Sequence, residues 1–523
     1  MSALVATLAA LLADAAAAQP GRLWQPGDRS LITSFVDVAA LALGRREVYV
    51  AGESGIAVWD HVEEAWRPPL APLEGYPERQ PVASLAYDGA ADALWLGTED
   101  GQLLRLGLTV GQWEPAEFRI DEPIIRIVPD AMEGLLWIGT SSGWYRVRGD
   151  GSEGSFVDRA SQIPSHVREI GETDLTVQAM SGTLTLDDML QRFPIETVIE
   201  GERPGTYFVG TQGGGLLLLD GNTLERTWLP FGTLSRGAGT VALVGNRLWF
   251  GGDGQGPRNG FAIADRNLRR WTQIETEVGG GPRGFTARIV PAGNAVWFAA
   301  SDGAYRLDNL SADSAAGGTA WTRFTTAQGL PADQTTTVVP LVQGAWIGTL
   351  RGLARVDGAG RVSATALEGR RILDLVLAGD TLWIATESGL FASIGDGAPV
   401  PAPGVDAVPA LRTTPIVSLA ARTGSIVALT PAAVHRFEGG RWTAASQEGA
   451  LAGLGRLLRL HVDTDGTLWV GGEGGAASLG QGPVRTWLVP GDIPAGPVRG
   501  LLVDGDNLWV ATPAGALRLN PTR

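Results

Sequence analysis

Short apolar stretches of about five to eight residues recur along the whole chain, and clusters of turn residues separate them. Residues 81–118 illustrate the pattern, with four such stretches at 81–88, 94–98, 102–106 and 112–118. Between the second and third stretches lies Asp100-Gly101, a pair of residues typical of a β-hairpin turn. Stretches this short favour strands over helices. The pattern therefore predicts a unit of four antiparallel strands.

The same unit returns roughly every 40 residues. Its second stretch is the most recognisable part, as in 94–101 (LWLGTEDG), 136–143 (LWIGTSSG) and 382–389 (LWIATESG). With looser copies, and two degenerate ones near Val177 and Val427, the sequence holds twelve. Four-stranded units at this spacing are typical of propeller blades. We predict an all-β fold, a β-propeller with about twelve four-stranded blades.

The tryptophans support this interpretation. Of the 18, eight lie in the second strand of a unit: Trp95, Trp137, Trp249, Trp297, Trp346, Trp383, Trp469 and Trp509. Eight more lie in or near an expected outer strand: Trp24, Trp66, Trp113, Trp228, Trp271, Trp321, Trp442 and Trp487. A large flat ring fills the space between twisted neighbouring sheets. We therefore expect these side chains to pack between blades rather than bind a ligand.

Twelve blades exceed the four to eight that a ring usually holds. We predict two rings of about six blades, with a single large ring as the alternative, and the sequence does not place a boundary between rings. The last unit, 498–519, has no outer strand of its own. Residues 21–26 (GRLWQP) look like such a strand, so we predict that an N-terminal strand closes the last blade.

The repeat also resembles a known family. Residues 463–471 (DTDGTLWVG) and 346–357 (WIGTLRGLARVD), with the turn at 329–333 (GLPAD), resemble the two-component regulator propeller repeat. The resemblance covers nearly all of residues 20–520. It implies an exported, sensor-type propeller that binds a ligand or a partner protein. Members of that family often join such rings to a membrane-spanning kinase, and we expect no kinase part in this chain.

The composition and the N-terminal residues limit the kinds of partner and the cellular locations that we expect. The net charge is −15 and no basic run is present, which argues against nucleic acid. Residues 1–18 resemble a signal peptide, with an apolar stretch and Ala16-Ala17-Ala18 before Gln19, although basic residues are missing in front. No stretch is long enough for a transmembrane segment. We expect a periplasmic or secreted protein whose blades occupy 19–523.

Catalytic and metal motifs are missing from the sequence. There is no cysteine, and the four histidines are not spaced as metal ligands. No nucleophile elbow or phosphate-binding loop precedes a predicted helix. We therefore expect no cofactor, no metal and no enzymatic activity. The alternatives are a propeller lyase or hydrolase that uses a channel histidine, and a scaffold subunit of an envelope assembly.

One group of residues suggests a binding site. Arg126, Arg168, Arg288 and Arg459 begin predicted inner strands at equivalent positions, and His166 and His461 lie on such strands. Arginines that converge on one opening would bind an anionic small molecule through planar donors. The alternative is that each arginine pairs with an acid on a neighbouring blade, such as Glu169 or Asp130. An envelope protein is the other partner that we consider.

Overall fold

A computed structural model describes residues 28–70, 76–77, 81–169, 185–187, 190–256, 258–276, 280–308, 321–422, 424–446, 449–480 and 482–521. In these ranges the chain forms eleven four-stranded antiparallel sheets, which confirms the predicted blades. The four strands predicted within 81–118 match β6 to β9 to within one residue at each end. The copy predicted near Val177 lies outside the described residues.

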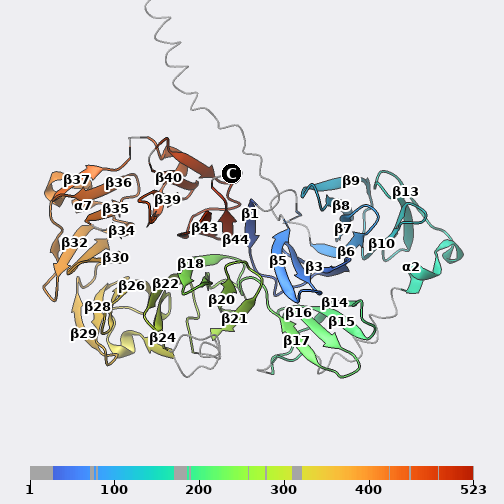
Figure 1. Ribbon diagram of the computed structural model, residues 1–523, viewed down its shortest axis with the longest axis horizontal. Coiled ribbons are helices and arrows are strands. Elements are labelled where there is room, and N and C mark those ends of the chain that lie inside the picture. Colours follow the sequence, from blue (N-terminus) through green and yellow to red (C-terminus); the bar gives the residue numbers. More distant parts are fainter. Residues whose placement is uncertain are drawn as a thin grey trace, which may run out of the picture.

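Seven sheets form a larger ring (Figure 1), in which neighbouring inner strands are in contact from β18 round to β42, and β42 contacts β18. The first four sheets are β18 (Ala238–Val244), β19 (Arg247–Gly252), β20 (Gly260–Asp265) and β21 (Trp271–Glu275); β22 (Thr286–Ala292), β23 (Ala295–Ala300), β24 (Gly303–Asp308) and β25 (Trp321–Phe324); β26 (Thr335–Pro340), β27 (Ala345–Thr349), β28 (Gly352–Val356) and β29 (Val362–Ala366); and β30 (Ile372–Ala378), β31 (Thr381–Thr386), β32 (Gly389–Ile394) and β33 (Val400–Pro401). The other three are β34 (Ser418–Arg422), β35 (Ser425–Leu429), β36 (Val434–Glu438) and β37 (Arg441–Ala444); β38 (Leu457–Val462), β39 (Leu468–Gly472), β40 (Gly475–Leu479) and β41 (Arg485–Leu488); and β42 (Gly500–Asp504), β43 (Asn507–Thr512) and β44 (Gly515–Leu519) with β1 (Arg29–Ile32).

Four further sheets lie beside it in an arc (Figure 1), which we call the smaller ring; β2 contacts both β6 and β14, and β6 contacts β10. They are β2 (Ala40–Leu43), β3 (Glu47–Gly52), β4 (Gly55–Asp60) and β5 (Ala65–Leu70); β6 (Val82–Asp88), β7 (Ala93–Thr98), β8 (Gln102–Gly107) and β9 (Trp113–Arg119); β10 (Arg126–Asp130), β11 (Leu135–Gly139), β12 (Trp144–Arg148) and β13 (Gly154–Phe156); and β14 (Ile195–Glu200), β15 (Thr206–Thr211), β16 (Gly215–Asp220) and β17 (Arg226–Leu229). The blade predicted near Val177 falls between β13 and β14 in chain order.

The boundary between the rings, which the sequence did not place, follows from this order. The smaller ring is inserted into the larger one, between β1 and β18. Short helices lie in the loops: α2 (Ser165–Glu169), α7 (Pro409–Thr413), and the 3₁₀ turns η1 (Ala160–Gln162), η2 (Thr326–Gln328), η3 (Val405–Ala407) and η4 (Ala452–Leu454). The proline-rich stretch around α7 is a loop within the larger ring and does not link the rings.

An N-terminal strand closes the last blade, as predicted. β1 pairs antiparallel with β44, with Arg29 opposite Leu519, in the sheet order β1-β44-β43-β42. The closing strand is Arg29–Ile32, whereas residues 21–26, to which the sequence assigned this role, lie outside the described residues. No tryptophan is needed at this outer position, because Leu31 and Ile32 are both buried there.

The second-strand tryptophans pack as expected. All eight are buried, with at most 8% of any of them exposed. Five of them meet other aromatic rings in the described part of the chain. Trp509, for example, lies 5.5 Å from Phe250 of the neighbouring sheet, measured between ring centroids. Burial of rings of this size contributes a large share of the stability of each blade.

The rings are joined by two linkers that lie side by side and by an aromatic cluster. Bridges connect Ser34, which follows β1, with Gly232 and Thr233, which precede β18. Beneath them, the Phe231 ring lies 4.6 Å from Trp66 of the smaller ring and 5.2 Å from Trp271 of the larger ring, measured between centroids. One continuous hydrophobic core therefore spans the junction.

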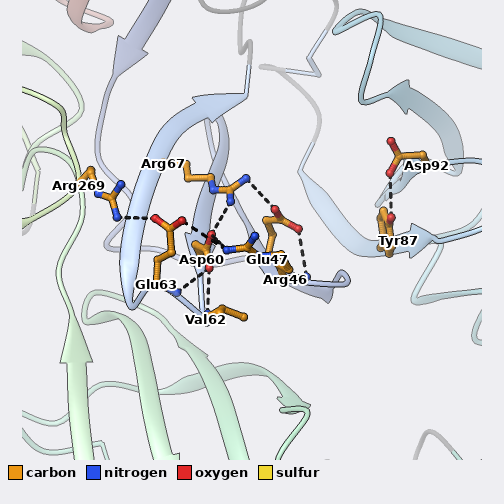
Figure 2. Close-up of polar contacts among 9 residues, drawn as sticks. All are labelled: Arg46, Glu47, Asp60, Val62, Glu63, Arg67, Tyr87, Asp92 and Arg269. Atoms are coloured by element: carbon orange, nitrogen blue, oxygen red, sulfur yellow. Dashed lines mark hydrogen bonds and ion pairs between the residues drawn. The ribbon is translucent and has the colours of Figure 1, made fainter.

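An ion-pair network lies at the edge of this junction (Figure 2). Arg269 of the larger ring donates to Glu63 at 2.6 Å, and its backbone carbonyl accepts a hydrogen bond from the Trp66 N–H. Within the smaller ring, Asp60 accepts hydrogen bonds from Arg67 at 2.5 Å and from Arg46 at 3.4 Å. The junction thus combines a buried apolar contact with a charged rim.

Candidate functional site

The four predicted arginines do not converge on one opening. Arg126 begins β10 in the smaller ring, whereas Arg288 on β22 and Arg459 on β38 belong to the larger ring. The expectation of one shared mouth is therefore wrong. The blade motif alone could not reveal this, because the blades of both rings carry the same repeat.

Residues 165–169 form the short helix α2 and not the inner strand predicted there. Pro164 precedes this turn, and its carbonyl accepts the Val167 N–H, as suits the start of a helix. Arg168 lies on α2, and its side chain is outside the described residues. His166 is half exposed, with its Nε2 3.5 Å from Asp130 Oδ2. Asp130 also accepts the N–H groups of Met132 and Glu133, so it is a turn-forming carboxylate.

Asp374 organises the inner strands of the larger ring. It is the third residue of β30, and its side chain is buried, with 2% of the residue exposed. Its two oxygens accept five hydrogen bonds, from Arg288 Nη2 (2.7 Å), Ser418 Oγ (2.9 Å), the Leu419 N–H (2.9 Å), Thr337 Oγ1 (3.3 Å) and the Leu375 N–H (3.0 Å). These donors come from β22, β26, β30 and β34, so one carboxylate ties four consecutive blades together. The inter-blade pairing considered for the arginines thus applies to Arg288.

Arg459 lies within electrostatic reach of this pair, and among the described residues it has no carboxylate partner. Its Nε donates to the Arg499 carbonyl at 2.6 Å, and its Nη1 donates to the Leu458 carbonyl at 3.1 Å. Burial and, to a lesser extent, the charge of Arg288 lower the pKa of Arg459 to about 10, and Asp374 acts in the opposite direction. Arg459 is charged at neutral pH, so two guanidinium groups lie within electrostatic reach of one carboxylate.

His461 follows two residues after Arg459, so both side chains lie on the same face of β38. Burial is the main cause of its lowered pKa, Asp463 opposes the shift, and Arg288 adds to it. His461 is therefore neutral at pH 7 and lies within the electrostatic reach of Arg288. We call Arg288, Asp374, Arg459 and His461 the inner-strand cluster.

The sequence analysis missed Asp374 and Thr337, although a signal was present for both. Asp374 pairs with Ala385 and Thr337 with Gly348, just as Arg288 pairs with Ala299 and Arg459 with Gly471. Aligning the blades on the small residue two places after the tryptophan would have placed all four in one register.

No group of three or more His, Cys, Asp or Glu side chains in the described residues is placed to hold a metal ion. No helix in the same ranges has the length and apolar character needed to cross a membrane.

The fold defines a two-ring β-propeller. No family model and no curated protein matches the chain, while many solved structures resemble it. One is the extracellular domain of the hybrid two-component system BT4673 from B. thetaiotaomicron, with 12% identity, a TM-score of 0.41, and coverage of 92% of this chain and 69% of that one. Another is the corresponding domain of BT3049, with 12% identity, a TM-score of 0.32, and coverage of 97% and 76%.

A third is PorZ, a surface component of the type IX secretion system of Porphyromonas gingivalis, with 12% identity, a TM-score of 0.42, and coverage of 96% and 73%. At such identities none of these structures establishes a family for this chain.

Proposed function

We propose that this chain is a non-enzymatic, sensor-like propeller that acts outside the cytoplasm and binds a small anionic ligand at the inner-strand cluster of the larger ring. The observation that carries the proposal is that Arg288 pairs with Asp374 at 2.7 Å, while Arg459 of the same ring donates only to backbone carbonyls in the described part of the chain. The signal-like residues 1–18 support the location outside the cytoplasm.

The charge balance of the cluster favours an anion. A carboxylate offers about four lone-pair sites, and Asp374 already accepts five hydrogen bonds. It has no acceptor capacity left for Arg459, whose guanidinium group donates only to backbone carbonyls within the described residues. One positive charge is therefore uncompensated in a partly buried place, where Coulomb attraction is stronger than in water. An oxyanion between the two guanidinium groups would neutralise it.

Binding of sulfate and of citrate, measured by isothermal titration calorimetry at low ionic strength, tests this proposal. The wild-type protein should bind at least one of these probes, and Arg459→Gln should weaken that binding about tenfold or more. Arg126→Gln is the matched control, because Arg126 occupies the same register position, opposite Gly139, in the other ring. Unchanged affinity in Arg459→Gln, or equal losses in both variants, would overturn the proposal.

A further inference from the structure

Arg436 departs from the repeat. In three of the described blades a third-strand arginine pairs across the sheet with the second-strand tryptophan and lies over its ring. The guanidinium carbon is 5.9 Å from the ring centroid for Arg105 over Trp95, and 5.8 Å for Arg306 over Trp297. The cross-strand partner of Arg436 is Val427, so this arginine has no indole ring beneath it.

Arg436 also lacks the ion pair that two of its counterparts make. Arg306 pairs with Asp308 at 2.8 Å, and Arg355 pairs with Asp396. No carboxylate in the described part of the chain pairs with Arg436, and its buried Nε has no hydrogen-bond acceptor. A half-buried guanidinium without any of these partners is costly unless something else satisfies it.

Arg436 lines a large cavity between its own blade and the next, which we call the blade groove. The groove has a volume of about 1240 Å³ and includes Arg422, Arg436, Glu438, Asp465, Trp469 and Arg485. Equivalent cavities beside Arg105 and Arg306 measure about 430 and 540 Å³. The groove is thus an enlarged form of a repeated feature, and the enlargement coincides with the loss of a tryptophan.

The donors in the blade groove exceed the acceptors. Arg422 donates to the Thr464 carbonyl at 3.1 Å, and Arg485 to the Pro521 carbonyl at 3.4 Å. Neither arginine forms an ion pair with an acid in the part of the chain that the structure describes. Both oxygens of Asp465 are occupied by Thr467. Trp469 is only 7% exposed, and its buried Nε1 has no acceptor.

We propose that the blade groove is a second binding site, and that it takes an extended ligand with at least two carboxylate groups. Guanidinium groups bind carboxylates through paired, planar hydrogen bonds, and three guanidinium groups line one cavity. The volume exceeds the roughly 300–1,000 Å³ of ordinary small-molecule pockets, which favours an extended ligand. Two carboxylates already line the groove, so a modestly charged ligand fits its charge better than a polyphosphate.

Calorimetry with citrate and with tetraglutamate distinguishes a small polycarboxylate from an acidic peptide, and tetraglutamine and sulfate serve as neutral and single-anion controls. We expect citrate or tetraglutamate to bind, and Arg436→Gln to weaken that binding about tenfold or more. The melting temperature should not change, because Arg436 has no partner to lose. Arg436→Lys should retain part of the affinity.

Arg306→Gln is the matched control, since Arg306 holds the same position in a blade whose arginine is already paired. Three results would overturn the proposal: no binding of either polycarboxylate, binding of sulfate alone, or an equal loss in Arg306→Gln. Loss of polycarboxylate binding in Arg459→Gln but not in Arg436→Gln would assign the ligand to the inner-strand cluster and also overturn the second site. The two proposals therefore fail separately.

Discussion

The Nη2 of Arg269 and the Oε2 of Glu63 are 2.6 Å apart and connect the two rings (Figure 2). Both side chains are nearly half exposed, with 47% and 43% of their surfaces accessible. Exposed ion pairs contribute about 0–1 kcal/mol, whereas a buried aromatic ring contributes several times more. The attachment of the rings therefore depends chiefly on the apolar cluster around Phe231.

Phe231→Ala should destabilise the protein by about 3–5 kcal/mol, because the ring is buried among Phe35, Trp66 and Trp271 and its removal leaves a cavity. Arg269→Ala should cost at most about 1 kcal/mol. Urea unfolding of the two variants measures the difference. A larger effect of Arg269→Ala would show that the charged rim, and not the core, holds the rings together.

The lowered pKa of Asp60 predicts that the protein loses stability in acid. Burial raises its pKa, but hydrogen bonds from the Glu63 N–H, the Arg67 side chain and the Val62 N–H outweigh burial and hold the pKa below its usual value of 3.8. The folded state thus favours the ionised form. The resulting stabilisation is present above the unfolded-state pKa and is lost as the pH falls through the folded-state pKa.

The difference in melting temperature between wild type and Asp60→Asn should therefore shrink as the pH is lowered from 7 to 3. A constant difference over this range would contradict the prediction.

Asp374→Ala should destabilise the larger ring by about 3–5 kcal/mol, because it leaves five donors and the Arg288 charge without their acceptor. Asp396→Ala is the control, since Asp396 pairs with Arg355 but is 76% exposed, and it should cost at most about 1 kcal/mol. Chemical denaturation compares the two. Similar costs would mean that Asp374 does not connect the blades.

Ile32→Ala tests the closing strand. Ile32 is fully buried on β1, so its truncation should cost about 2–5 kcal/mol. Ile394→Ala makes the same chemical change at a side chain that is 74% exposed, and it should stay within about 0.5 kcal/mol of wild type. Thermal unfolding distinguishes them, and equal melting temperatures would argue against closure by β1.

The lowered pKa of His461 predicts that the affinity for an anion depends on pH. Burial, and to a lesser extent Arg288, lower its pKa from the usual 6.5, and an anion bound beside it would raise the pKa again. The bound state then takes up more protons, so anion affinity should rise as the pH falls below about 6.5. His461→Asn should remove this pH dependence. Titrations of sulfate or citrate at pH 5.5 and 7.5 provide the measurement.

The blades were predictable because a tryptophan followed at fixed spacing by a small residue marks the second strand of a blade. The division of the blades into two rings was not predictable from the repeat, because blades of both rings carry the same motif. Arg126 and Arg459, for example, occupy identical register positions in different rings. The sequence predicted that an N-terminal strand closes the last blade, but it placed this strand at 21–26 because of Trp24. The strand that closes the blade is Arg29–Ile32, in which Leu31 and Ile32 are the buried side chains.

The candidate site was predictable only in part. Arg288, Arg459 and His461 were identified, but Asp374 was missed because one acidic residue in an apolar strand has no local signature. Arg436 lies at a third-strand position that other blades also fill with arginine, so the repeat alone does not distinguish it. Its difference becomes visible only when Val427 is recognised as its cross-strand partner.

The pairing of β1 with β44 sets the order in which this chain can mature. During synthesis β1 emerges first and β44 last, with the whole smaller ring between them. All described strands of the smaller ring are synthesised before β18, whereas the larger ring cannot close until β44 has been made. A ribosomal product that stops short of Gly515 leaves β1 without its partner strand. Such an exposed edge invites aggregation or proteolysis, so closure acts as a check that synthesis has passed β44.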